Sequence, residues 1–169
     1  CNQVCEHCHV DAGPDRKEIM TKETMIQCLE VIKKTGAHTL DLTGGAPEMN
    51  PNFRWFVDEA SKVGIKDFIV RSNLTIIKSN KKFADLPAFF KSHNVHVVSS
   101  MPHWTKGKTD KQRGTGVFDL SIEALKELNA IGYGMPDSKL RLDLVYNPSG
   151  AFLPGNQSSL EKDFKKSLL

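Results

Sequence analysis

The stretch TKETMIQCLEVIKKTGAHTLDLTGG (residues 21–45) holds one complete helix-to-strand unit of this 169-residue chain. Thr21 can cap a helix over Lys22–Thr35, in which apolar side chains recur at helical spacing on one face. Gly36 is well placed to end that helix. Residues 38–43, with Leu40 and Leu42 at alternate positions, then predict a short strand that runs into two glycines. The rest of the chain repeats this unit.

The same alternation continues to the end of the chain. Further helices are predicted over residues 53–60, 82–92, 119–131 and 160–169, and further strands over 68–70, 95–98 and 140–146. Pro87 either breaks the second of these helices or marks its true start. Regular alternation of strand and helix predicts a parallel sheet with right-handed crossovers. We therefore expect an α/β fold, a partial parallel (β/α) barrel truncated at one or both ends, with residues 1–169 forming a single core domain.

Composition and charge exclude several classes of function. The net charge is +3 and no dense basic stripe is present, so we expect no nucleic-acid partner. No apolar run reaches the length of a membrane span and no signal peptide is visible, so we expect a cytoplasmic protein without a membrane partner. The chain lacks an initiator methionine, and we expect it to be a fragment of a longer protein whose first strand precedes Cys1.

Three of the four cysteines lie within the first eight residues, which predicts a metal site. Cys1, Cys5 and Cys8 can bind three irons of a [4Fe–4S] cluster and leave the fourth iron open for chemistry. The alternative is a structural zinc site completed by His7 or His9, although a zinc site usually has a second ligand pair elsewhere in the chain. The fourth cysteine, Cys28, lies on the apolar face of a predicted helix and is expected to be a core residue.

Every predicted strand ends in small or polar residues, and α/β folds place their active sites at such strand ends. These residues are Gly44-Gly45, Asn73, Ser99-Ser100 and Asn147-Pro148. Glycines let a backbone approach a ligand closely, although a simple turn into a helix explains the glycine pair equally well. Ordinary strand-end capping is likewise the alternative for the polar side chains.

The spacing of Cys1, Cys5 and Cys8 after an expected strand resembles the signature of the radical S-adenosylmethionine (radical SAM) superfamily. The resemblance implies that these cysteines bind the cluster and that S-adenosylmethionine (SAM) is the second cofactor. The superfamily usually has an aromatic residue before the third cysteine, and His7 holds that position here. The resemblance therefore also implies that His7 packs near the adenine.

The strand ends extend this resemblance. The segment Gly44-Gly45-Ala46-Pro47-Glu48 is similar to the Gly-Gly-Glu-Pro segment whose backbone binds the amino group of SAM. Glu48 is displaced in this order, and its own role stays open. By the same resemblance, Asn73 lies in a turn beside the site, and Ser99 or Ser100 meets the ribose.

Longer stretches are similar to the arsenosugar biosynthesis branch of the superfamily, namely residues 1–14, 40–48, 73–75, 111–114 and 146–154. That branch is expected to transfer the 5′-deoxyadenosyl group to a trivalent dimethylated arsenical, with an external electron donor such as flavodoxin or ferredoxin. It usually carries a Cys-rich segment after the barrel. This chain has Ser72 and His103 where the branch carries cysteines, which puts the arsenical substrate in doubt.

Three further interpretations of the cysteine motif stay open. The chain could belong to another radical SAM branch, such as a peptide-modifying one. It could instead bind zinc without catalysis, or fold without holding a cluster because Cys1 is terminal and chain ends fray.

Charged and aromatic residues outside the cysteine motif give weaker predictions. Residues 106–116, rich in Lys, Thr and Gly, predict a mobile loop that with His103 and Trp104 could form a lid. Within that loop we expect the lysines and Arg113 on a solvated surface, and a substrate role is the alternative. Arg71, near a strand end, is a candidate to reach a carboxylate, and an ion pair or solvent exposure is expected for Arg141 and Asp143.

Overall fold

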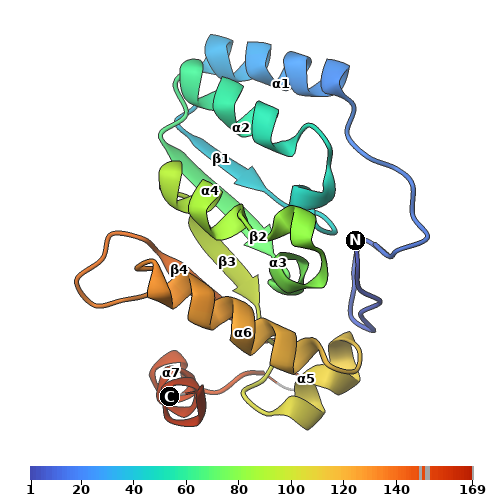
Figure 1. Cartoon of the computed structure of the whole chain (residues 1–169), viewed down its shortest axis with the longest axis vertical. Helices are drawn as coiled ribbons and strands as arrows, with labels where there is room; N and C mark the ends of the chain where they lie inside the picture. Colours follow the sequence, from blue (N-terminus) through green and yellow to red (C-terminus); the bar gives the residue numbers. More distant parts are fainter. Residues whose placement is uncertain (149, 151–152, 169) are drawn as a thin grey trace.

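Four parallel strands form the only sheet in the described part of the chain, in the order β1-β2-β3-β4. The computed structural model describes residues 1–148, 150 and 153–168. Figure 1 shows the strands, which are β1 (Thr39–Leu42), β2 (Asp67–Ser72), β3 (His96–Ser100) and β4 (Leu142–Val145). The prediction of an α/β fold with a partial parallel (β/α) barrel is confirmed.

Helices connect the strands, as the alternation predicts. They are α1 (Lys22–Thr35), α2 (Phe53–Lys62), α3 (Thr75–Ser79), α4 (Leu86–Ser92), α5 (Lys106–Arg113), α6 (Val117–Ala130) and α7 (Gln157–Leu168), with 3-10 turns η1 (Pro47–Met49) and η2 (Lys81–Phe83). The Thr21 hydroxyl accepts a hydrogen bond from the Thr24 amide at 3.2 Å and caps α1, and Gly36 ends that helix at a φ of 67°. Pro87 marks the true start of α4, where its missing amide hydrogen is tolerated.

The structure differs from the sequence prediction in two segments. The expectation of a loop over residues 106–116 is wrong, because α5 occupies most of that range. The short helix α3, directly after β2, was not predicted. Ser149, Ala151 and Phe152 of the 146–154 motif, and Leu169 of the last predicted helix, lie outside the described residues. Within the described ranges, no helix is long and apolar enough to cross a membrane.

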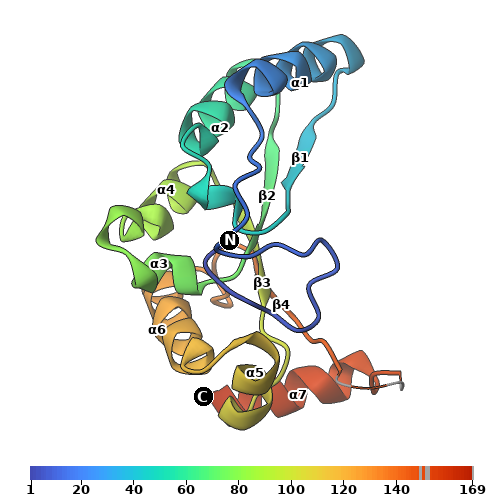
Figure 2. The same cartoon turned by 90° about the vertical axis from the view of Figure 1, so that its right-hand side faces the viewer.

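The two faces of the sheet have different chemistry. Figure 2 shows α2, α4 and α6 on one side of the strands, where Phe68, Val70 and Val97 are buried against them. Side chains of the opposite face include two polar pairs. Arg71 binds the Asp41 carboxylate through two nitrogens, and His96 Nε2 lies 2.7 Å from Asp143 Oδ2. The sheet therefore buries its apolar side under the helices and presents a polar side on the other face.

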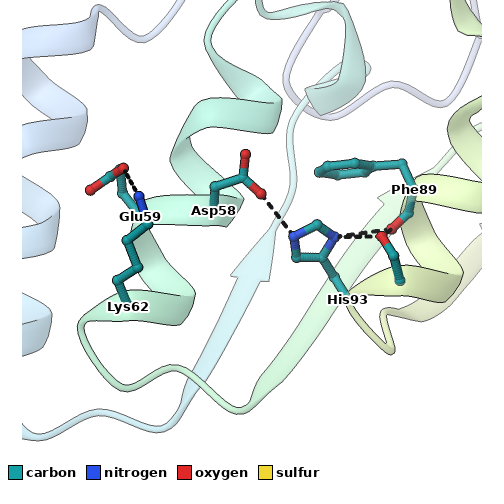
Figure 3. Close-up of polar contacts among 6 residues, drawn as sticks. Asp58, Glu59, Lys62, Phe89 and His93 are labelled. Atoms are coloured by element: carbon teal, nitrogen blue, oxygen red, sulfur yellow. Dashed lines mark hydrogen bonds and ion pairs between the residues drawn. The ribbon is translucent and has the colours of Figure 1, made fainter.

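A separate polar contact joins α2 to the end of α4, away from the strand ends (Figure 3). His93 Nε2 lies 2.9 Å from Asp58 Oδ1, and His93 Nδ1 contacts the Phe89 carbonyl and the Ser92 hydroxyl. The Ser92 hydroxyl donates to the Phe89 carbonyl at 2.8 Å, so it is engaged in ending the helix. This series of serine, histidine and aspartate stabilises the packing of two helices.

Candidate functional site

The N-terminal segment lies beside the carboxyl ends of the strands (Figure 1). It brings the three clustered cysteines to one cavity. Cys1, Cys5 and Cys8 are free thiols of intermediate exposure, and all three line a cavity of about 610 Å³. Gly44 and Gly45, at the end of β1, line the same cavity. The fourth cysteine, Cys28, packs against the core from α1, as predicted.

Gly45 lies against the cysteine segment so closely that a side chain would not fit. A Cβ built on Gly45 would lie 2.9 Å from the Cys1 Cβ and 3.0 Å from the Ala12 Cβ. The preceding Gly44 has a φ of 134°, a conformation that L-residues with side chains rarely adopt. The glycine pair is therefore required for the backbone of β1 to meet the cysteine segment.

Each of the three sulfurs has a different polar neighbour. The Ala12 backbone amide donates to Cys8 Sγ at 3.3 Å, and the side-chain Nδ2 of Asn73 donates to Cys1 Sγ at 3.8 Å. Cys5 donates to Gln3 Oε1 at 3.5 Å. Burial raises the pKa of the Cys5 thiol, and the charge of Arg113 counters part of that effect.

The end of β2 makes a tight turn that carries polar groups to the cysteine segment. The Thr75 amide donates to the Asn73 carbonyl at 2.8 Å, and the intervening Leu74 has a φ of 63° and a ψ of −44°. These values describe a γ-turn with a positive φ at its central residue, which is the rare and strained form. The Asn73 side chain donates to Asn2 Oδ1 at 2.7 Å, and Gln3 donates to the Thr75 hydroxyl at 2.8 Å. The turn thus ties β2 to the residues that directly follow Cys1.

Some of the remaining predicted site residues reach this cavity and others do not. His7, Asn73 and Ser100 line it. Ser99 is fully buried on the helix-facing side of β3, and its hydroxyl has no hydrogen-bond partner among the described residues. Ala46 and Pro47 line a second cavity of about 430 Å³, which Cys1 and the glycine pair also border. The structure therefore brings Ser100, and not Ser99, to the cysteines.

Glu48 is buried behind the glycine segment, where it contacts neither cavity. Its side chain is 4% exposed, and neither carboxylate oxygen makes a hydrogen bond of ordinary geometry within the described ranges. Burial raises the pKa of Glu48, and the neighbouring Ser72 hydroxyl offsets only part of that rise. Burial under the turn therefore favours the protonated form of Glu48 over the ionised form.

Arg113 is the functional candidate that sequence reasoning missed. The expectation of a solvated surface is wrong, because the Arg113 side chain is 4% exposed and lines the cavity beside Cys5 and Cys8. Its Nη2 donates to Gln3 Oε1 at 2.6 Å. The neighbouring backbone also holds the cysteine segment, since the Glu6 amide donates to the Gln112 carbonyl at 3.0 Å. No apolar periodicity marks α5, so the sequence carried no signal for this contact.

His103 and Trp104, predicted as part of a lid, belong to an aromatic cluster with Tyr146 and Phe164. The His103 and Trp104 rings lie 4.0 Å apart, and the Trp104 ring meets the edge of Phe164, on α7, at 5.4 Å. Pro102, and not His103, lines the cavity. These aromatic residues therefore fix α7 beside the carboxyl end of the sheet.

Comparison with known proteins gives the family context of this geometry. A sequence model of the Radical SAM superfamily matches residues 1–146. A probable GTP 3′,8-cyclase of Saccharolobus islandicus is 27% identical over 141 residues, which cover 83% of this chain and 43% of that protein. The mycofactocin maturase MftC of Mycobacterium tuberculosis is 30% identical over 139 residues, covering 79% of this chain and 33% of that protein. The chain thus spans less than half the length of these relatives.

Proposed function

This chain belongs to the Radical SAM superfamily, whose members use a [4Fe–4S] cluster and SAM, and from that premise we propose that it cleaves SAM reductively. In the described part of the chain, no three His, Cys, Asp or Glu side chains converge on one point that would suit a single metal ion. A cubane cluster instead requires each thiolate on a separate iron around a shared space. The observation that carries the proposal is that Cys1, Cys5 and Cys8 are free and line one cavity with Gly44 and Gly45.

Within this proposal, Cys1, Cys5 and Cys8 hold the cluster, which when bound supplies the electron that cleaves SAM to a 5′-deoxyadenosyl radical. The backbone of residues 44–47 binds the methionine end of SAM, and Gly45 keeps that backbone against Cys1. His7, Asn73 and Ser100 surround the nucleoside, since all three line the same cavity.

Product formation tests the proposal. The protein is reconstituted anaerobically with iron and sulfide, reduced with dithionite and incubated with SAM, and 5′-deoxyadenosine is measured by chromatography. We expect 5′-deoxyadenosine from the unsubstituted chain and none from Cys5→Ser. Cys28→Ser is the matched control, because it removes a thiol that packs on the core, and it is expected to retain the activity. Equal activity of Cys5→Ser and the unsubstituted chain would contradict the proposal.

We further propose that the 5′-deoxyadenosyl group is transferred to a trivalent dimethylated arsenical, in the manner of arsenosugar biosynthesis. The long motifs over residues 1–14 and 40–48 support this substrate. Ser72, where that branch carries a cysteine, is fully buried on the helix-facing side of β2 and does not line the cavity. Its hydroxyl instead accepts a hydrogen bond from the Leu74 amide at 3.2 Å. A serine at this position therefore removes no thiol from the cavity wall.

A second candidate is the chemistry of another branch, which the similarity to a cyclase and a maturase supports. Parallel incubations with dimethylarsenite and with GTP distinguish these candidates by mass spectrometry. An adenosylated arsenical supports the first candidate, and a cyclised nucleotide supports the second. If neither product forms, both small molecules are excluded as substrates. We also propose a small-molecule substrate, a cytoplasmic location and reduction by an external donor such as flavodoxin or ferredoxin.

A further inference from the structure

Arg113 is a buried cation that no carboxylate neutralises within the described residues. Its side chain is 4% exposed, and none of the ion pairs among those residues includes it. One nitrogen, Nη2, donates to the neutral Gln3 amide oxygen, and Nε has no hydrogen-bond partner in the same part of the chain. A buried guanidinium without an anion is costly, so a compensating negative charge is expected nearby.

Within the part of the chain that the structure describes, the ionisable groups whose negative charge would act on Arg113 are the side chains of Cys5 and Cys8. Burial lowers the pKa of Arg113, and the charges of Cys5 and Cys8 raise it. Arg71, another cationic side chain lining the cavity, is already neutralised by Asp41, with a nitrogen-to-oxygen distance of 2.8 Å. Arg113 therefore supplies an uncompensated positive charge on this wall of the cavity.

We propose that Arg113 is a positioning residue that raises the reduction potential of the cluster held by Cys1, Cys5 and Cys8, an inference that rests on the proposed function. A cubane held by three thiolates is negatively charged, and reduction adds one further electron. A nearby cation in a site of low dielectric stabilises the reduced form more than the oxidised form. The same side chain fixes the cysteine segment through Gln3, so Arg113 acts on the cluster by charge as well as by position.

Four variants separate the charge from the contact. Arg113→Gln removes the cation, and Arg113→Lys keeps it. Gln3→Glu keeps a hydrogen-bond partner for Arg113, but the new carboxylate neutralises the positive charge of the guanidinium. Lys111→Gln removes one charge from the exposed face of the same helix and is the matched control for net charge. Each protein is reconstituted, its iron and sulfide content is measured, and the midpoint potential is determined by a redox titration followed by EPR.

We expect a shift to more negative midpoint potential in both Arg113→Gln and Gln3→Glu, with Arg113→Lys and Lys111→Gln close to the unsubstituted chain. If Arg113→Gln retains no cluster, Gln3→Glu and Arg113→Lys still decide the question. Unchanged potentials in the loaded Arg113→Gln or Gln3→Glu variants overturn the role of Arg113 while leaving the proposed function intact. An unsubstituted chain that takes up no cluster overturns both.

Discussion

At Gly45 the lack of a side chain determines how close the cysteine segment comes to the sheet. The nearest neighbours of a Cβ there would be Cys1 and Ala12, which belong to the backbone stretch that carries the thiols. A side chain cannot enter without moving that stretch, because real Cβ atoms do not approach other atoms at 2.9 Å. The residue therefore contributes by its size, and sequence alone did not distinguish this role from a simple turn.

The substitution Gly45→Ala is expected to displace the cysteine segment. Overpacking of this kind costs about 1–3 kcal/mol. We expect it to destabilise the packing of the N-terminal segment and not the hydrophobic core, because the crowded contacts to Cys1 and Ala12 lie outside that core. Iron retained after reconstitution should drop, while the thermal midpoint of the fold stays close to the original. Gly13→Ala is the control in the same segment, where nothing lies within 4 Å of an added Cβ. Equal iron content in both variants would contradict the role of Gly45.

Glu48 predicts a pH dependence of stability. Burial raises the pKa of Glu48 in the folded state, so the fold favours the protonated form. The stabilising contribution is complete below the unfolded pKa of about 4.3 and is lost as the pH rises through the folded pKa. We expect Glu48→Gln to be more stable than the unsubstituted chain at neutral pH, by about 1 kcal/mol or more, with the difference vanishing at low pH.

Urea unfolding at a series of pH values measures this difference. Glu30→Gln is the control, since it removes the same charge from an exposed position on α1. A Glu48→Gln variant that is less stable than the unsubstituted chain at neutral pH would show that the ionised carboxylate has a partner in solution.

Among the elements, α5 and α6 show most clearly where the sequence pattern was insufficient. The buried residues of α5 are Thr109, Gln112 and Arg113, so its inward face is polar and gives no hydrophobic periodicity. By contrast, α6 buries Ala124, Leu125 and Leu128 at helical spacing, and its existence was predicted correctly. The helix α3 follows a strained turn and has only five residues, too few for a periodic pattern.

Asp110, on α5, is expected to stabilise the start of α6. Its two carboxylate oxygens accept hydrogen bonds from the Gly116 amide at 3.0 Å and the Phe118 amide at 2.8 Å. These contacts replace the side-chain cap that Gly116 cannot supply. Asp110→Ala should lower the free energy of unfolding by about 0.5–2 kcal/mol, as measured by denaturant titration.

Asp119→Ala is the control for this prediction, because Asp119 lies in the first turn of α6 and forms an exposed ion pair with Lys106. Exposed pairs contribute about 0–1 kcal/mol. A larger loss for Asp119→Ala than for Asp110→Ala would mean that the interhelical cap contributes nothing beyond surface charge.

For the whole molecule, the alternation of helix and strand was sufficient to predict the parallel sheet and the edge at which the cysteines lie. The pattern could not separate Ser99 from Ser100, because Val97 and Val98, directly before them, place apolar side chains on both faces of the strand. Nor could it place Arg113, whose position depends on the folding of α5 against a segment more than 100 residues earlier. Contacts between distant elements therefore complete a site whose proposed cluster ligands, Cys1, Cys5 and Cys8, are local in sequence.

The EPR spectrum of the reduced cluster with and without SAM is the direct test of whether this chain binds a cluster that coordinates SAM. After anaerobic reconstitution and reduction, we expect the EPR signal of a [4Fe–4S] cluster that changes when SAM is added, because three thiolates leave one iron open to the cofactor. A cluster signal that SAM does not alter, or a chain that binds zinc in place of iron, would contradict the account.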